Sequence, residues 1–211
     1  MNERTMTESV QALRGELYVI AAPSGAGKTS LVRALMARQP KLALSVSDTT
    51  RPARSTEQEG EQYCFVDRAT FDAKCAAGRY LEHAEVFGQG YGTDRERVEA
   101  LWAAGRDVIL EIDVQGAAQV CQRQPDVCQI FILPPSIELL AQRLRGRGTD
   151  QEDVIARRLA EAEHEMAAAQ SFDWFIVNDD FETALAQLEA VVVAWRQRRQ
   201  RQLDHLTSLL A

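Results

Sequence analysis

The sequence contains no long apolar run and no surplus of positive charge. No window approaches 18 apolar residues, so we expect no membrane-spanning helix. The net charge of −7 argues against a general nucleic-acid binder, because such proteins need a dominant basic face. The N-terminus is polar and lacks the apolar stretch of a signal peptide. These absences predict a cytoplasmic protein that binds neither membranes nor nucleic acid.

Cysteine is scarce and widely spaced. The four cysteines, Cys64, Cys75, Cys121 and Cys128, are too far apart for paired metal ligands and form no recognisable disulfide framework. A reduced compartment is the default for such a chain. The remaining composition, with 45% apolar and 26% charged residues in 211, is that of a globular domain.

Apolar segments alternate with helical patterns along most of the chain. Continuous apolar runs predict strands at 17–21, 107–112, 129–133 and 174–177, inside a parallel sheet that helices cover on both faces. Helical patterns occur at 29–38, 95–104, 115–123, 136–144, 150–169 and 181–201. The alternation predicts an α/β fold with a parallel sheet core flanked by helices.

Two regions depart from this alternation. Residues 48–92 combine a turn-rich stretch with alternating apolar residues, which predicts a small antiparallel lobe inserted into the core. Residues 146–168 are rich in Arg, Glu and Ala and begin with glycine, which predicts a helical lid. We therefore expect a lead-in over 1–15 and one domain over 16–211, whose core comprises 16–47, 93–145 and 170–200.

A glycine-rich run, Ala22-Pro23-Ser24-Gly25-Ala26-Gly27-Lys28-Thr29, separates the first predicted strand from the first predicted helix. This is the context of a phosphate-binding loop, although Ala22 stands where the usual pattern has its first glycine. Backbone N–H groups of such a turn bind anions, and the helix N-terminus adds about half a positive charge. Lys28 would reach the β- and γ-phosphates, and Thr29 would ligate Mg²⁺. An ordinary glycine turn capping a helix is the alternative.

Residues 49–65 contain a second candidate phosphate site. Arg51 and Arg54 could clamp a phosphate, with Tyr63 and Tyr91 as phenolic donors to the same anion. A solvated turn whose arginines pair with neighbouring glutamates is the alternative.

Glu82 alternates with apolar neighbours and could therefore face a cleft. Guanine presents N1–H and N2–H₂ as adjacent donors, and one carboxylate can accept from both, whereas adenine has no such pair. An exposed strand carboxylate is the commoner case.

Together with these residues, a series of motifs resembles the bacterial guanylate kinases over about residues 16–195. The matching segments lie at 24–29, 49–65, 81–88, 91–93, 112–116, 134–136, 143–148 and 176–180. They include Leu-Glu-His-Ala-Glu-Val-Phe-Gly, Ile-Asp-Val-Gln-Gly and Arg-Leu-Arg-Gly-Arg-Gly. The resemblance implies phosphorylation of GMP, and of dGMP, with ATP as donor and Mg²⁺ as metal.

The resemblance also assigns roles to single residues. ATP is expected to contact the loop Ala22, Pro23, Ser24, Gly25, Ala26, Gly27, Lys28 and Thr29, together with Asn178, which matches a family position near the adenine. GMP is expected to contact Ser47, Arg51, Arg54, Glu57, Tyr63, Glu82, Tyr91, Gly92, Thr93, Glu111 and Asp113. Of this set, Glu82, Thr93 and Glu111 are expected to face the base. The expected catalytic residues are Lys28, Arg143, Arg147 and Arg158, and the expected metal ligands are Thr29 and Asp113.

Several of these residues have a purely structural alternative. Asp113 could cap the helix that starts near Gln115. Asn178 could form a turn, and the arginines at 143–147 could end a helix. Two positions depart from the family pattern: Glu111 replaces an aspartate, and Gly90 replaces an aromatic residue and is expected to loosen its loop.

Two other functions compete with the kinase. One is a guanylate-kinase-like protein-interaction module, and the other is a kinase that acts on a ribose bisphosphate. The intact run Gly27-Lys28-Thr29 disfavours the first, and Glu82 with the 49–65 signature disfavours the second. The apolar stripe of Leu185, Leu188, Val192 and Trp195 fits both a helix that covers its own sheet and a homo-oligomer contact.

Overall fold

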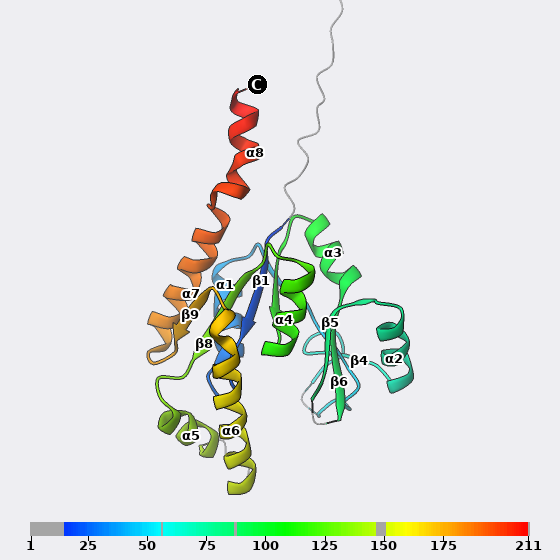
Figure 1. Cartoon of the computed structure of the whole chain (residues 1–211), viewed down its shortest axis with the longest axis vertical. Helices are drawn as coiled ribbons and strands as arrows, with labels where there is room; N and C mark the ends of the chain where they lie inside the picture. Colours follow the sequence, from blue (N-terminus) through cyan, green and yellow to red (C-terminus); the bar gives the residue numbers. More distant parts are fainter. Residues whose placement is uncertain (1–14, 56, 87, 147–150, 211) are drawn as a thin grey trace, which may run out of the picture.

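The computed structural model describes residues 15–55, 57–86, 88–146 and 151–210. In this part of the chain, a five-stranded sheet forms the core, in the order β2-β7-β1-β8-β9 (Figure 1). Its strands are β1 (Leu17–Ala21), β2 (Leu42–Leu44), β7 (Asp107–Glu111), β8 (Cys128–Leu133) and β9 (Trp174–Val177). All neighbouring pairs are parallel, which confirms the predicted core.

Strand β1 is buried on both faces, as its continuous apolar sequence predicts. Tyr18 and Ile20 pack in one cluster with α1 (Lys28–Arg38) and α7 (Phe181–Arg196). Leu17 and Val19 point the other way and pack in a second cluster with α3 (Arg95–Ala103) and α4 (Val114–Arg123). Because successive side chains of β1 point to opposite faces of the sheet, α1 and α7 cover one face and α3 and α4 cover the other.

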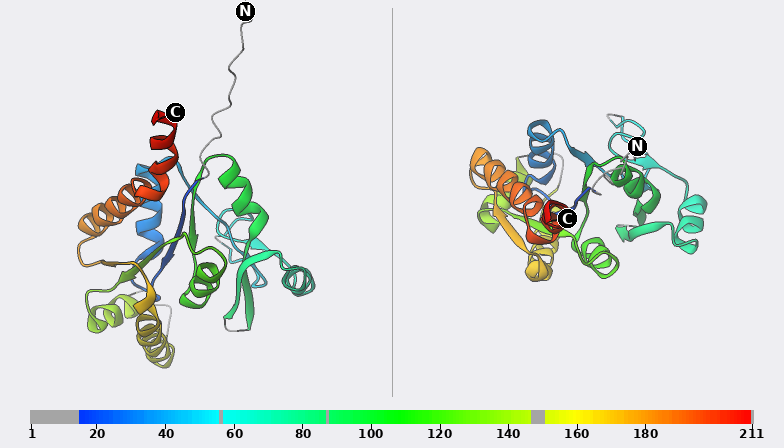
Figure 2. Two further views of the ribbon diagram at one scale, coloured as in Figure 1. Left: turned by 45° about the horizontal axis from the view of Figure 1, so that its top comes forward. Right: turned by 90° about the horizontal axis from the view of Figure 1, so that it is seen from above.

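The inserted lobe contains β3 (Asp48–Thr49), β4 (Cys64–Phe65), α2 (Arg68–Ala76), β5 (Tyr80–Val86) and β6 (Gln89–Asp94). Its sheet order is β4-β3-β6-β5. The predicted small lobe is present, but its sheet is mixed rather than antiparallel throughout: β3 and β4 are parallel, and the other pairs are antiparallel. The long turn between β3 and β4 brings the chain back in its original direction, which a tight hairpin cannot do. Figure 2 shows this lobe beside the core, on the side away from α7.

A buried ionic network fixes the base of the lobe. Asp48 is fully buried and accepts hydrogen bonds from Lys74 Nζ (2.7 Å), from the Tyr80 hydroxyl (2.8 Å) and from the guanidinium of Arg97. Lys74 also donates to Asp94 at 3.1 Å. The network connects α2, α3 and β5 to β3. It therefore fixes the position from which the chain leaves β3 toward residues 50–63.

The predicted lid corresponds to α6 (Glu152–Ala168), which packs on α5 (Ile137–Arg145) and leads into a short 3-10 turn, Ala169–Ser171. The shared apolar cluster of α5 and α6 is formed by Leu140, Leu144, Ile155 and Ala162. Residues 147–150, at the start of the predicted lid, lie outside the described residues.

The C-terminal region differs from its prediction. The helix expected over 181–201 ends at Arg196, and a separate helix, α8 (Arg199–Leu210), extends away from the core (Figure 1). Arg198 explains the break, since its guanidinium donates to Glu16 (2.5 Å) and Asp126 (2.6 Å) and lies 4.2 Å from the Trp195 ring centroid. These contacts hold the segment between the two helices against the core.

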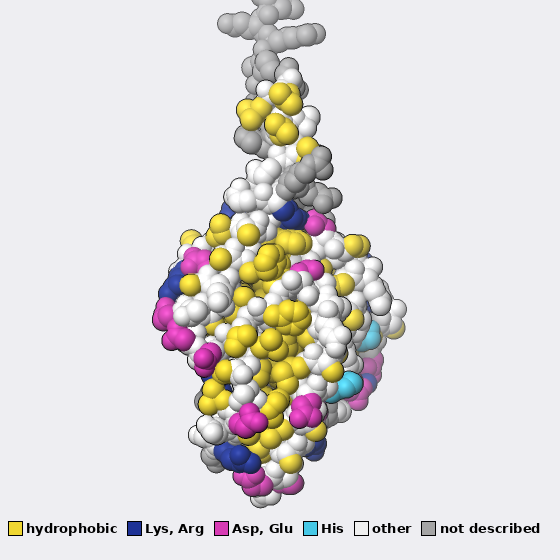
Figure 3. All heavy atoms as spheres, turned by 60° about the vertical axis from the view of Figure 1, so that its left-hand side comes forward, with side chains coloured by type: hydrophobic (Ala, Val, Ile, Leu, Met, Phe, Trp, Pro, Cys, Tyr) yellow, Lys and Arg dark blue, Asp and Glu magenta, His cyan; other side chains and the backbone are white. Residues whose placement is uncertain are grey.

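Strand β9 is an edge strand. Trp174, Phe175 and Val177 are 39%, 47% and 47% exposed, so the expectation that this strand is covered on both faces is wrong. Figure 3 shows apolar side chains on this side of the molecule and, separately, along α8. Among the described residues, no helix combines the length and the apolar character needed to cross a bilayer.

Candidate active site

The loop between β1 and α1 depends on two glycines. Gly25 and Gly27 have φ values of 97° and 94°, in the left-handed region that favours glycine. A Cβ at Gly25 would lie 3.0 Å from the Leu140 side chain, and one at Gly27 would lie 2.4 Å from Asn178 Nδ2. Ala22 packs partly buried against the core, where a small residue fits. The loop therefore leads into the N-terminus of α1 with the shape of an anion-binding turn.

Lys28 and Thr29 begin α1 and point toward the end of β7. Lys28 Nζ donates to the Ile112 carbonyl at 3.3 Å, and Thr29 Oγ1 donates to Glu111 Oε1 at 3.0 Å. Burial lowers the pKa of Lys28, while the carboxylates of Glu111, Glu165 and Asp113 act in the opposite direction. The ammonium group of this half-buried lysine thus lies among carboxylates that offset part of the effect of burial on its pKa.

Glu82 faces inward from the lobe, as expected. It is 4% exposed and lies opposite Thr93 in the β5–β6 register, where Thr93 Oγ1 donates to Glu82 Oε1 at 2.5 Å. Burial raises the pKa of Glu82 to about 7, and Asp113 adds to this rise. Asp113 itself caps α4 by accepting a hydrogen bond from the Gly116 N–H at 2.7 Å. The capping role predicted for Asp113 is therefore confirmed.

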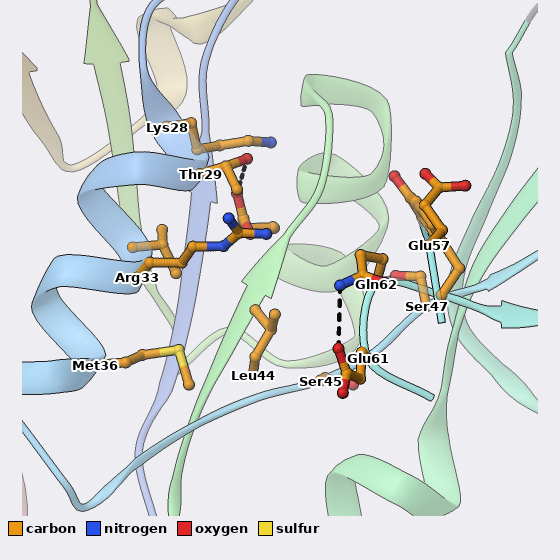
Figure 4. A pocket seen from close by; sticks show the side chains of 13 residues that line it. Lys28, Thr29, Arg33, Met36, Leu44, Ser45, Ser47, Glu57, Glu61 and Gln62 are labelled. Carbon is orange, nitrogen blue, oxygen red and sulfur yellow. Dashed lines mark hydrogen bonds between the residues drawn. The ribbon is translucent and has the colours of Figure 1, made fainter. Parts of the chain in front are cut away.

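Two adjoining cavities lie between the phosphate-binding loop (the P-loop, residues 22–29), β7 and the lobe. One, of about 220 Å³, is lined by Glu82, Tyr91 and Asp113 among others. The other, of about 650 Å³, extends along α1; Figure 4 shows Lys28 and Thr29 on one wall and Ser47, Glu57 and Gln62 across from them. The residues common to both cavities are Lys28, Ser47, Tyr63 and Glu111. The space that Glu82 faces is thus continuous with the space at the P-loop lysine.

Arg51 is held at the edge of this space by an ion pair. Its guanidinium donates to Glu57 Oε1 at 2.8 Å and lies 5.4 Å from the Tyr63 ring centroid, while the ring of Tyr63 lies 5.7 Å from that of Tyr91. Glu57 raises the pKa of Arg51, and Arg51 lowers that of Glu57. Arg54 is exposed, and its backbone N–H donates to Glu57 Oε2 at 2.8 Å. The arginine–glutamate pairing foreseen as the alternative is thus present for Arg51.

Gly90 and Gly92 lie in β6, next to aromatic rings. A Cβ at Gly90 would lie 2.6 Å from Phe71, and one at Gly92 would lie 2.9 Å from Tyr80. Gly90 is buried, and its backbone bonds to Thr50 through both its N–H (2.8 Å) and its carbonyl (3.0 Å). The expectation that Gly90 loosens a loop is wrong, because the residue belongs to a packed strand.

Two of the arginines expected to contact the transferred phosphoryl group lie on α5 and α6. Arg143, in the last turn of α5, donates to the Asn178 carbonyl at 3.0 Å. Asn178 is buried, and its side chain donates to the Ala26 carbonyl at 2.6 Å. Arg158 lies half-buried on α6, and Arg147 lies outside the described residues.

Comparison with known proteins decides the family. The guanylate kinase family model matches residues 14–195. The chain belongs to the guanylate kinase family. Among curated guanylate kinases, those of Alkalilimnicola ehrlichii and Thiobacillus denitrificans are 55% and 52% identical to it, over 93% and 92% of this chain and 97% and 93% of theirs. The solved guanylate kinase of Anaplasma phagocytophilum superposes with a TM-score of 0.75 at 33% identity, covering 92% of this chain and 93% of that one.

Guanylate kinase membership confirms the α/β fold and the expected activity, ATP-dependent phosphorylation of GMP. The substrates of such an enzyme are GMP and ATP. The relatives named above give no support to an interaction module or to a kinase for a ribose bisphosphate.

Two site residues were missed by the sequence reasoning. Gly116 makes room for the acidic pair, since a Cβ there would lie 2.6 Å from Glu82 Oε2 and 3.4 Å from Asp113 Oδ1. This glycine lies in the run Ile-Asp-Val-Gln-Gly. Its place in that motif is the signal from which a need for a residue without a side chain could have been predicted. Glu165 of α6, whose pKa burial raises to about 7, belongs to no motif, and only the fold brings it toward Lys28.

Proposed function

We propose that phosphoryl transfer takes place where the two cavities meet, with ATP on the P-loop and GMP, or dGMP, against the lobe. The observation that carries this proposal is that Lys28 lines the same cavity as Glu82 and Asp113. A phosphomonoester has a second pKa of about 6, so GMP arrives mostly as a dianion and needs no general base. The site has to align two nucleotides and offset charge on the transferred group.

Glu82 and Asp113 are the proposed readers of guanine. Both line the smaller cavity, and both approach the space above Gly116. Their carboxylates can accept hydrogen bonds from N1–H and N2–H₂ of guanine. Thr93 orients Glu82 through its 2.5 Å hydrogen bond. AMP lacks these donors, so this pair supports selection of guanine over adenine.

Glu111 is better placed to serve the metal than the base. It accepts the hydrogen bond of Thr29 Oγ1, the hydroxyl expected to ligate Mg²⁺. Magnesium is commonly bound by one or two protein oxygens together with phosphates and water. The described residues contain no cluster of three or more candidate metal ligands, which fits a metal shared with the nucleotide. We assign Thr29 and Glu111 to Mg²⁺, whose charge would offset that of the phosphates, and Asp113 to the base.

The phosphate of GMP is assigned to Arg51 and Arg54, with Tyr63 and Tyr91. The ion pair with Glu57 holds the Arg51 guanidinium over Tyr63 and so reduces the conformational entropy lost on binding. Arg143 and Arg158, from α5 and α6, are assigned to the transferred phosphoryl group. Arg147 has the same role by family likeness.

A coupled assay with ATP and a panel of acceptors tests this assignment. GMP and dGMP should be phosphorylated, while AMP, UMP and ribose 1,5-bisphosphate should react at least about 100-fold more slowly, since buried polar groups left unpaired penalise the wrong acceptor. Equal activity with AMP and GMP would refute the role of Glu82 and Asp113. Transfer to the ribose bisphosphate in preference to GMP would refute the guanine-binding pocket altogether.

A further inference from the structure

Asn178 joins two parts of the donor site that are far apart in the sequence. It follows directly after β9, and its own N–H donates to the Leu133 carbonyl at the end of β8 (2.8 Å). Its side-chain Nδ2 crosses to the P-loop and donates to the Ala26 carbonyl at 2.6 Å. The residue is only 6% exposed, so this contact is shielded from water.

The contact restricts one peptide unit of the P-loop. The carbonyl of Ala26 and the N–H of Gly27 belong to the same trans peptide, in which they point in opposite directions. A donor that holds the carbonyl on one side therefore turns the N–H toward the other side, away from Asn178. Gly27 has no side chain to resist rotation, and its φ of 94° is readily lost without a restraint.

The same residue also holds an arginine. The Asn178 carbonyl accepts a hydrogen bond from Arg143 at 3.0 Å, at the end of α5. One buried residue thus contacts both the loop assigned to the donor phosphates and an arginine assigned to the transferred group. Its backbone is fixed by the sheet, so it can act as a rigid reference for both.

We infer that Asn178 is a positioning residue for the P-loop: its side-chain amide orients the Ala26–Gly27 peptide so that the Gly27 N–H faces the donor phosphates. The inference rests on the proposed role of the P-loop in binding ATP. It differs from the expectation that Asn178 contacts adenine. A residue that reads adenine acts on ATP alone, whereas one that orients the loop acts on every triphosphate donor, whatever its base.

The test uses Asn178→Asp, which keeps the side chain's size but replaces the amide donor with an acceptor. Asp179→Ala, at an exposed neighbouring position of the same loop, is the matched control. We expect kcat/KM to fall by about 10- to 100-fold with ATP, as for small misplacements of reacting groups. With GTP as donor it should fall by the same factor, and the KM for GMP should stay within about two-fold. The control should behave like the wild type.

Amide hydrogen exchange of the ligand-free protein provides a readout that does not depend on activity. Amides of residues 25–29 should exchange faster in Asn178→Asp than in the wild type, while those of β1 and α4 remain unchanged. If the wild-type protein failed to phosphorylate GMP, the proposed function would be refuted. The difference in hydrogen exchange between the variant and the wild type would still test the role of Asn178 in the P-loop. Unchanged kinetics, or a loss confined to ATP, would overturn the inference. So would loss of the fold in Asn178→Asp, because the residue would then support the whole domain rather than the loop.

Discussion

Substitution of Glu82 by Gln tests the acceptor pocket most directly, because it should weaken GMP binding and stabilise the protein at once. The substitution keeps the shape of the side chain and leaves an oxygen to accept from Thr93. It removes the charge and one of the two acceptors offered to guanine. A hydrogen bond to a charged group contributes about 1.5–3 kcal/mol, so kcat/KM for GMP should fall by about 10- to 100-fold at pH 8.

The loss should depend on pH. Glu82 has a pKa of about 7 in the free protein, and only its ionised form accepts both guanine donors. Wild-type affinity for GMP should therefore fall by about ten-fold between pH 8 and pH 6, beyond any effect of the substrate's own ionisation near pH 6. The Gln variant lacks this component, so the ratio of wild-type to variant kcat/KM should shrink across the same range.

The free energy of unfolding should change with pH in the opposite direction to the affinity for GMP. Burial raises the pKa of Glu82 from 4.5 to about 7, so between these values the folded state binds a proton more tightly than the unfolded state. Stability then falls as pH rises through this window. At about 1.4 kcal/mol per pH unit, ionised Glu82 costs the folded state about 3 kcal/mol at pH 8. The Gln variant should be more stable than the wild type by about that amount at pH 8, and by little at pH 4.5.

Urea unfolding at pH 5 and pH 8, together with initial rates at pH 6 and pH 8, measures both effects. Thr93→Val provides a comparison variant rather than a neutral control, since it removes the hydrogen bond that orients Glu82 but keeps the carboxylate. A Gln variant less stable than the wild type at pH 8 would refute the claim that Glu82 is an ionised, buried base reader. So would wild-type and variant kcat/KM values that keep the same ratio at both pH values.

Three further substitutions test other parts of the site. Lys28→Ala should lower kcat by at least about 100-fold while calorimetry shows GMP binding mostly intact, and near-normal turnover would contradict its assignment. Glu111→Gln should raise the Mg²⁺ concentration needed for half-maximal rate and leave the KM for GMP within about two-fold; the reverse pattern would return Glu111 to the base. Asp48→Asn should cost about 2–3 kcal/mol in urea unfolding, because it leaves Lys74 and Arg97 without their buried carboxylate, and an unchanged midpoint would show that the network contributes little.

The core could be predicted because its strands are apolar on both faces. In β1, five consecutive buried residues leave few alternatives to an inner parallel strand. β2 was missed because it has only three residues, too few for a pattern. β9 carries the same kind of apolar sequence as β1, yet it lies at the sheet edge. Composition indicates that a strand belongs to a sheet, and only pairing determines its place in the order.

Two carboxylates at the end of β7, Glu111 and Asp113, show where prediction from the sequence pattern fails. Glu111 and Asp113 are two residues apart, and in a continuous strand they would share a face. The strand ends at Glu111, however, and Asp113 becomes the N-cap of α4, so the two side chains separate. Glu111 approaches Thr29, and Asp113 approaches Glu82. The family motif gives the identity of both acids, while a strand end that the sequence does not mark determines which neighbouring side chain each one approaches.

Asn178 shows the complementary limit, in which a local motif has a distant partner. Its neighbours Asp179 and Asp180 favour a turn, and family likeness favours adenine; neither interpretation includes Ala26, 152 residues earlier. Parallel strands bring their carboxyl ends to one edge of a sheet, so the residues that follow β1 and β9 meet there although β8 lies between the two strands. A residue that follows any of these strands can therefore contact the P-loop. The residue that makes this contact must have a side chain of the right length. Here the short amide of Asn178 fits, because Gly27 has no side chain in the space between them.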